Sequence, residues 1–167
     1  MKRGRKAAPT FEDSELLLAN HASSSDWFDA LCAFDDELSS RGSGGQTTAV
    51  VASVDGSRVV GASVGDSCAW LVSPTGQVSD LTANQRRRPL LGSGEALPVQ
   101  FDAELDGSRL LLASDGLLKY ATVEQICAIA TQGAVAEAAD ALANCVRLPS
   151  GAVPDDIAVV VLTGDTN

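Results

Sequence analysis

The chain changes texture sharply at the glycine-rich stretch around residue 45, and this change constrains the fold more than any other feature. Before it, large apolar residues recur at helical spacing between Trp27 and Leu38, so we expect an amphipathic helix capped by Ser25 or Asp26. After it, short runs rich in valine and alanine alternate with turn residues, as in β-strands. The sequence therefore predicts a helix followed by a sheet.

Four short strands are predicted directly after the glycine-rich stretch. Residues 47–54 and 58–64 are separated by Asp55-Gly56-Ser57, which is a hairpin signal. Runs at 67–72 and 77–81, separated by a Pro-Thr-Gly turn, continue the series. We expect these strands to form an antiparallel meander.

The second half of the chain begins with a predicted loop at 82–98. This segment holds arginine, proline and glycine with little periodicity, and a loop of this length in a compact domain is usually functional or mobile. The leucine-rich run 109–114 then predicts a buried strand. The last run, 157–163, is uninterrupted apolar, so we expect it to be central in a sheet.

Two helices are predicted between these last strands. Thr122 and Gln125 form a capping-box sequence, and Gly133 separates this helix from a second one. Strands followed by helices and a final strand indicate an α+β fold, with antiparallel sheets in layers and the helices packed outside.

A length of 167 residues suits a single domain, which we place at residues 11–167. We expect residues 1–10 to be a disordered tail with four basic residues, Lys2, Arg3, Arg5 and Lys6. A contact with nucleic acid or a partner is the alternative for this cluster. The net charge of −10 argues against nonspecific binding to nucleic acid or to anionic membrane. No apolar run reaches membrane-spanning length, and four scattered cysteines indicate reduced thiols, so we expect a cytoplasmic protein.

Acidic residues lie next to three of the predicted strands. Asp66 lies between two strands, Asp115 follows the buried strand, and Asp155 with Asp156 precedes the last strand. Carboxylates at strand ends can converge at one edge of a sheet, where Mg²⁺ or Mn²⁺ takes such oxygens together with water. Each position has a second interpretation, because Asp-Gly and Pro-Asp-Asp are also turn sequences.

Six short motifs occur in an order that is more specific than any one of them. They are Gly44-Gly-Gln-Thr-Thr-Ala-Val, Val64-Gly-Asp-Ser, Val78-Ser-Asp-Leu-Thr, Leu91-Gly, Leu111-Leu-Ala-Ser-Asp-Gly-Leu and Asp155-Asp-Ile-Ala-Val-Val-Val. This succession resembles the metal-dependent serine/threonine protein phosphatase family (PPM, type 2C), which shows GTTA, GDSR, LT, LG, LLLxSDGL and DNxTVVV. The resemblance covers the C-terminal two-thirds of the family's domain.

The resemblance implies a phosphatase-type β-sandwich of antiparallel sheets flanked by helices, with two Mg²⁺ or Mn²⁺ ions at one end. A metal-activated water would attack the phosphorus of phosphoserine or phosphothreonine. Asp115 matches the SDG aspartate and Asp155 the first residue of the DN pair, both metal ligands in the family. Asp66 matches the GDS aspartate, which in some members helps to hold a third metal ion. Asp156 stands where asparagine is usual, and Cys68 where arginine is common.

The largest departure concerns DGxGG, the N-terminal motif whose aspartate bridges both metal ions in the family. No DGxGG occurs before Gly44. Glu12 and Asp13 resemble the family's Glu-Asp pair only superficially, because they lie too close to Thr47. We therefore expect a fold truncated at its N-terminus, with an incomplete site for one weakly held Mg²⁺ or Mn²⁺ ion.

Three consecutive arginines, Arg86, Arg87 and Arg88, fall in the loop that corresponds to the family's flap region. Guanidinium groups suit phosphate, so these residues are predicted to bind substrate. A solvated loop is the alternative interpretation.

Three hypotheses about function follow. The first is a phosphatase that acts on phosphoserine or phosphothreonine in proteins. The second is a pseudophosphatase, which keeps the fold and binds a phosphoprotein or regulator without turnover. The third is a non-functional truncation that exposes a sheet edge and associates through it.

Overall fold

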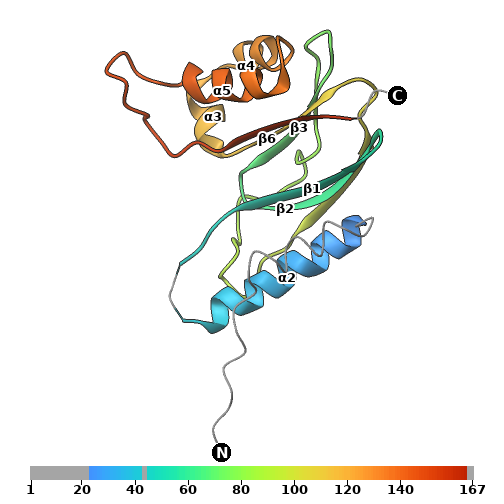
Figure 1. Cartoon of the computed structure of the whole chain (residues 1–167). Helices are drawn as coiled ribbons and strands as arrows, with labels where there is room; N and C mark the ends of the chain where they lie inside the picture. Colours follow the sequence, from blue (N-terminus) through green and yellow to red (C-terminus); the bar gives the residue numbers. More distant parts are fainter. Residues whose placement is uncertain (1–22, 43–44, 165–167) are drawn as a thin grey trace, which may run out of the picture.

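The computed structural model describes residues 23–42 and 45–164, and within them two antiparallel sheets lie face to face. The first sheet has the strand order β1-β2-β5: Ala49–Asp55, Arg58–Val64 and Val99–Glu104. The second has the order β4-β3-β6-β7: Val78–Asp80, Cys68–Val72, Arg109–Ala113 and Val159–Thr163. The helices are α2, α3, α4 and α5: Ser24–Ser40, Asp115–Tyr120, Val123–Ala130 and Val135–Cys145. Helix α2 covers the first sheet, and α4 and α5 lie outside the second (Figure 1), which confirms the predicted layered α+β sandwich.

The predicted meander is wrong, although its strands exist. β1 and β2 form the expected hairpin, with Asp55 opposite Arg58. β2 then pairs with β5, whereas β3 pairs with β4 and β6 in the other sheet. The chain changes sheets at Gly65, whose φ of +95° suits glycine far better than other residues. β5 itself was not predicted, although Val-Gln-Phe-Asp-Ala-Glu alternates apolar and polar residues, the pattern of a half-buried strand; Phe101 is its buried residue.

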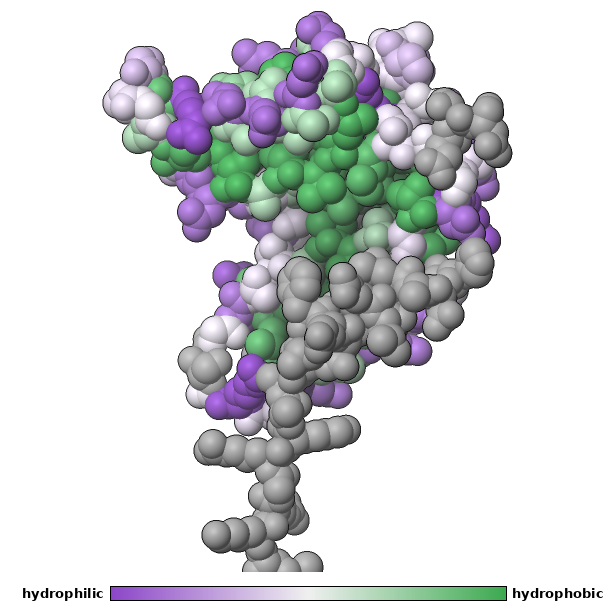
Figure 2. Space-filling view, in the orientation of Figure 1, coloured by the Kyte–Doolittle hydropathy of each residue, from purple (hydrophilic) through white to green (hydrophobic). Residues whose placement is uncertain are grey.

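The last strand is also placed differently from the prediction. Among the described strands β7 lies at the edge of its sheet, paired only with β6. Its side chains Val160 and Leu162 are 47% and 37% exposed, although the run is uninterrupted apolar. In the orientation of Figure 1, the space-filling view in Figure 2 shows a broad apolar surface across the middle of the molecule. Association through an exposed edge stays a prediction.

Strand β6 supplies both parts of the core around the second sheet. Leu110 packs in the cluster between the two sheets, with Val59 and Phe101. Leu111, its neighbour, packs on the other side of the sheet with Ile126 of α4 and further residues of α5. Both leucines are fully buried, and replacing such a leucine by alanine typically costs about 2–5 kcal/mol.

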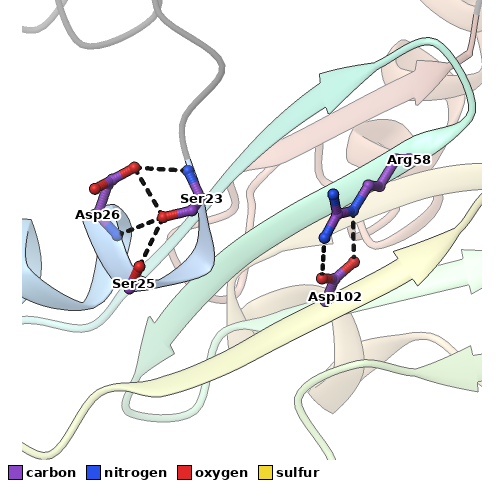
Figure 3. A network of polar contacts seen from close by, with 5 residues as sticks. All are labelled: Ser23, Ser25, Asp26, Arg58 and Asp102. Carbon is purple, nitrogen blue, oxygen red and sulfur yellow. Dashed lines mark hydrogen bonds and ion pairs between the residues drawn. The ribbon is translucent and has the colours of Figure 1, made fainter.

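The helix starts follow capping rules, with one shift from prediction. Helix α2 is capped by Ser23, not by Ser25 or Asp26, because Asp26 occupies the third helical position and completes a capping box (Figure 3). Helix α4 begins at the predicted capping box of Thr122 and Gln125.

Three further expectations concern the chain as a whole. The four cysteines are free, and burial raises the pKa of the Cys68 thiol to about 12, so this thiol is unreactive at neutral pH. Within the described residues, no helix is both long enough and apolar enough to span a membrane. The predicted basic tail, residues 1–10, lies outside the described residues, and the cytoplasmic location stays a prediction.

The GTT and LG motifs lie side by side in the structure. Thr47 and Leu91 exchange backbone hydrogen bonds of 3.0 and 3.1 Å. Gly92 has a φ of +91°, and a Cβ there would lie 2.3 Å from the carbonyl oxygen of Gly45. This close approach requires glycine, so the glycine of the LG motif holds the loop 82–98 against the entry to β1.

Asp35 of α2 holds the other side of this loop. Its side chain is 4% exposed, and its carboxylate accepts hydrogen bonds from the backbone N–H groups of Gly92, Gly94 and Ala96 at 2.6, 3.1 and 2.7 Å. Burial alone would raise the pKa of Asp35, but these backbone donors outweigh burial and lower it below its usual value. The ionised carboxylate therefore fixes this part of the loop.

Asp35→Asn should lower the free energy of unfolding at pH 7 by about 3 kcal/mol, because the N–H donors lose their charged acceptor. The native pKa of Asp35 lies below that of the unfolded chain. Its contribution is therefore complete above about pH 4 and is lost as the pH falls through the native pKa. Urea unfolding at pH 7 and pH 3 should show a smaller difference between wild type and variant at pH 3. The exposed neighbour provides the control Asp36→Asn, and an equal difference at both pH values would contradict this account.

Candidate functional site

The pairing of β6 with β7 brings two predicted site residues to the same end of the second sheet. The two strands run antiparallel with Ala113 opposite Val159. Asp115 begins α3 two residues after β6, and Asp155 lies four residues before β7. Because the strands run antiparallel, the end of one and the start of the other meet at one edge.

Ser114 and Gly116 hold the segment before β7 against the start of α3. The backbone N–H of Ser114 donates to the carbonyl oxygen of Ala158 at 3.0 Å, and its hydroxyl accepts from the Ala158 N–H at 3.0 Å. The same hydroxyl donates to the carbonyl oxygen of Asp156 at 3.2 Å. A Cβ at Gly116 would lie 2.5 Å from that carbonyl oxygen, so only glycine permits the approach. The serine and glycine of the SDG motif thus set where Asp155 lies.

Lys119 joins the two aspartates. Its Nζ lies 2.7 Å from Asp115 Oδ2 and 3.0 Å from Asp155 Oδ2. The other oxygen of Asp155 accepts the backbone N–H of Asp156 at 2.9 Å. Hydrogen bonds to Asp115 and Asp155 raise the pKa of Lys119, and those from Lys119 and Asp156 lower the pKa of Asp155. The ammonium and the Asp155 carboxylate therefore both stay charged at neutral pH.

A cavity of about 310 Å³ lies beside this cluster. Its lining residues come from both halves of the sandwich: Asp66, Arg87, Asp115, Leu118 and Lys119. Asp66 arrives from the turn after β2, and Arg87 from the loop 82–98. The structure thus brings Asp66 and Asp115 to one cavity. All three arginines are exposed, and of them only Arg87 is part of the lining.

These side chains, as arranged, do not fit a divalent metal centre. Within residues 23–42 and 45–164, no three side chains of histidine, cysteine, aspartate or glutamate lie together as candidate ligands. One oxygen of Asp115 and one of Asp155 contact the Lys119 ammonium, which would repel a further cation. The two predicted metal ligands therefore meet, but they meet around a lysine.

The sequence predictions missed Lys119. It lies four residues after Asp115, a spacing that places two side chains on the same face of a helix. This i, i+4 spacing was not recognised as helical, because α3 is only six residues long and no helix was predicted there.

The fold resembles that of bacterial serine/threonine phosphatases of known structure. One, described as a bacterial serine phosphatase, superposes with a TM-score of 0.75 at 20% identity, covering 93% of this chain and 76% of that one. The phosphatase Stp1 from Staphylococcus aureus gives 0.68 at 19% identity, with 97% and 72% covered. The catalytic domain of the phosphatase PstP, in complex with two manganese ions, gives 0.71 at 23% identity, with 85% and 71% covered.

The chain therefore has the fold of bacterial PPM-family serine/threonine phosphatases, as its ordered motifs predict. It spans about 70% of the length of these relatives. No model of a known protein family matches the sequence, and no curated protein matches it significantly. At this level of identity the comparison establishes the fold, and activity must be argued from the side chains.

Gly116→Ala should lower the free energy of unfolding by about 2 kcal/mol, because the added methyl group collides with the backbone before β7. Alanine is the better helix former, so helix propensity alone predicts the opposite sign. Urea unfolding followed by circular dichroism measures the difference. A variant as stable as wild type would mean that the segment holding Asp155 moves aside without cost.

Proposed function

We propose that this chain is a binding module with a phosphatase fold, which engages phosphoserine or phosphothreonine in a protein partner or regulator without metal-dependent hydrolysis. The observation that carries the proposal is the Lys119 ammonium, which lies between Asp115 and Asp155 at the cavity that Arg87 also lines. A lysine in this position occupies one oxygen of each carboxylate that a metal ion would need, and it adds a donor at the cavity.

The chemistry of the cavity supports a phosphate ligand. Arg87 offers a planar guanidinium group, which can form two parallel hydrogen bonds with phosphate oxygens, and Lys119 offers an ammonium group. Asp66 and Asp115 carry opposite charge at the same cavity, so the binding should be weak and depend on Arg87. A cavity of about 310 Å³ has room for a phosphorylated side chain and little more.

A labelled phosphothreonine peptide should bind with a dissociation constant between about 10 µM and 1 mM in a fluorescence anisotropy titration. Arg87→Ala should weaken this binding about tenfold, because the guanidinium–phosphate bonds are lost. Arg58→Ala removes an equal charge from an exposed strand pair and should leave binding unchanged. The unphosphorylated peptide should not bind. Equal binding of both peptides would overturn the proposal.

Metal-dependent hydrolysis is the second candidate. It is favoured by the meeting of Asp115 and Asp155 at one sheet edge and by the two manganese ions in the structure of PstP, which shares this fold. In that case Asp115, Asp155 and Asp66 would hold Mg²⁺ or Mn²⁺, and Lys119 would first have to leave. The arrangement of the lysine makes this the weaker candidate.

Phosphate release from a phosphothreonine peptide at about 5 mM Mn²⁺ separates the two candidates. We expect no Mn²⁺-dependent turnover from wild type or from Asp115→Asn. Turnover by wild type that disappears in Asp115→Asn would instead establish the phosphatase.

A further inference from the structure

Lys119 occupies the position between two carboxylates where a bound cation would be most stable. Its ammonium contacts Asp115 within α3 and Asp155 across the gap to the segment before β7. Both contacts are within hydrogen-bonding distance, at 2.7 and 3.0 Å, so one ammonium group forms ion pairs with two carboxylates. Because the lysine is attached to α3, it competes with a free ion at a high effective concentration.

A divalent cation would gain little at this pair while the lysine is present. Mg²⁺ and Mn²⁺ need oxygen ligands free of other strong donors, and both aspartates direct an oxygen toward Nζ. An ion that displaced Lys119 would leave the ammonium close to a second positive charge, which is unfavourable. The lysine therefore excludes such an ion as well as replacing its charge.

The contribution of these ion pairs to folding is small, so stability alone does not account for the lysine. The side chain of Lys119 is 53% exposed, and those of Asp115 and Asp155 are 34% and 37% exposed. Exposed ion pairs stabilise proteins little, because water screens the charges and long side chains lose freedom. Ser114 and Gly116 already hold the segment before β7 through backbone contacts.

We propose that Lys119 is the resident cation of the Asp115–Asp155 pair, so that the wild-type chain folds and functions without a divalent ion here. Removing the ammonium creates a divalent cation site from the same carboxylates. This inference rests on the same Lys119 contacts as the proposed function and deepens it, because it adds the ion preference of the pair, which the recognition of phosphate does not involve. The two have separate readouts, since peptide binding can fail while this inference holds.

Manganese titration by calorimetry and thermal unfolding with and without MnCl₂ test the proposal. Wild type should show no saturable binding and no change in Tm at about 5 mM Mn²⁺. Lys119→Ala should bind one equivalent with a dissociation constant of about 1 mM, and its Tm should rise by about 3 °C. Lys119→Arg keeps the positive charge and should behave like wild type. The double variant Lys119→Ala/Asp155→Asn should lose the effect.

Arg58→Ala is the matched control for net charge. Arg58 of β2 pairs with Asp102 of β5 on the exposed side of the first sheet (Figure 3), and its removal changes the net charge by the same amount. Glu104 also lies near Arg58, but its carboxylate accepts a hydrogen bond from the Ser57 hydroxyl, so only Asp102 loses its hydrogen-bond partner and this variant should not bind Mn²⁺. If Lys119→Ala does not fold, as judged by circular dichroism, Lys119→Gln decides the question in the same assays.

Two outcomes would overturn the proposal. One is saturable Mn²⁺ binding by wild type that Lys119→Ala does not strengthen by at least about threefold. The other is a folded Lys119→Ala variant with no more affinity for Mn²⁺ than Arg58→Ala.

Discussion

The register between β6 and β7 is the constraint on which the candidate site depends. With Ala113 opposite Val159, the chain leaves β6 into α3 at the point where the segment before β7 arrives. A slip of one residue would turn the side chains of β6 to the opposite faces of the sheet. Leu110 and Leu111 are each fully buried in a different cluster, so such a slip would turn each leucine into the other cluster and disrupt the packing of both. The core thereby fixes where the carboxylates meet.

This fixed geometry holds the carboxylates of Asp115 and Asp155 close together, and different cations can balance their charge. Two carboxylates held at one edge repel each other unless a cation lies between them. The structure of PstP, which has this fold, contains two manganese ions. Here the charge comes from Lys119, one helical turn after Asp115. On the function proposed above, one side chain changes what the site can do while the strands around it keep their arrangement, and a shared fold does not by itself establish a shared activity.

The sequence was most informative where local chemistry decides the structure. The hairpin at Asp55-Gly56-Ser57 and the capping box of Thr122 and Gln125 were predicted because each needs only neighbouring residues. Strand partners could not be derived in this way: the pattern locates β2 and β3 but does not show that they lie in different sheets. The prediction that the last strand is central in its sheet was wrong for a related reason. An apolar run indicates burial but does not show which strands lie beside it, and β7 lies at an edge.

At the candidate site, too, the residues were predicted where a local motif marks them, and contacts between distant segments were missed. Ordered motifs placed Asp115 and Asp155 at strand ends, and the structure brings them together through Lys119. The role of Lys119 depends on α3, a helix too short to give a periodic signal. Asp35 was missed because its partners, the backbone N–H groups of residues 92–96, lie about sixty residues further along the chain and carry no side-chain signature.

The cavity is lined by residues of α3 and of loops that connect strands of both sheets, so a ligand there can contact groups from both layers. Asp66 follows β2 of the first sheet, whereas Asp115 and Lys119 belong to α3, which follows β6 of the second. Arg87 comes from the loop whose far end Asp35 and Gly92 hold against α2 and the entry to β1. A ligand that contacts Arg87 and Lys119 together therefore bridges the two layers. Its affinity depends on how firmly the loop is held as well as on the groups that touch it, because a guanidinium group that must first be ordered loses part of its binding energy to entropy.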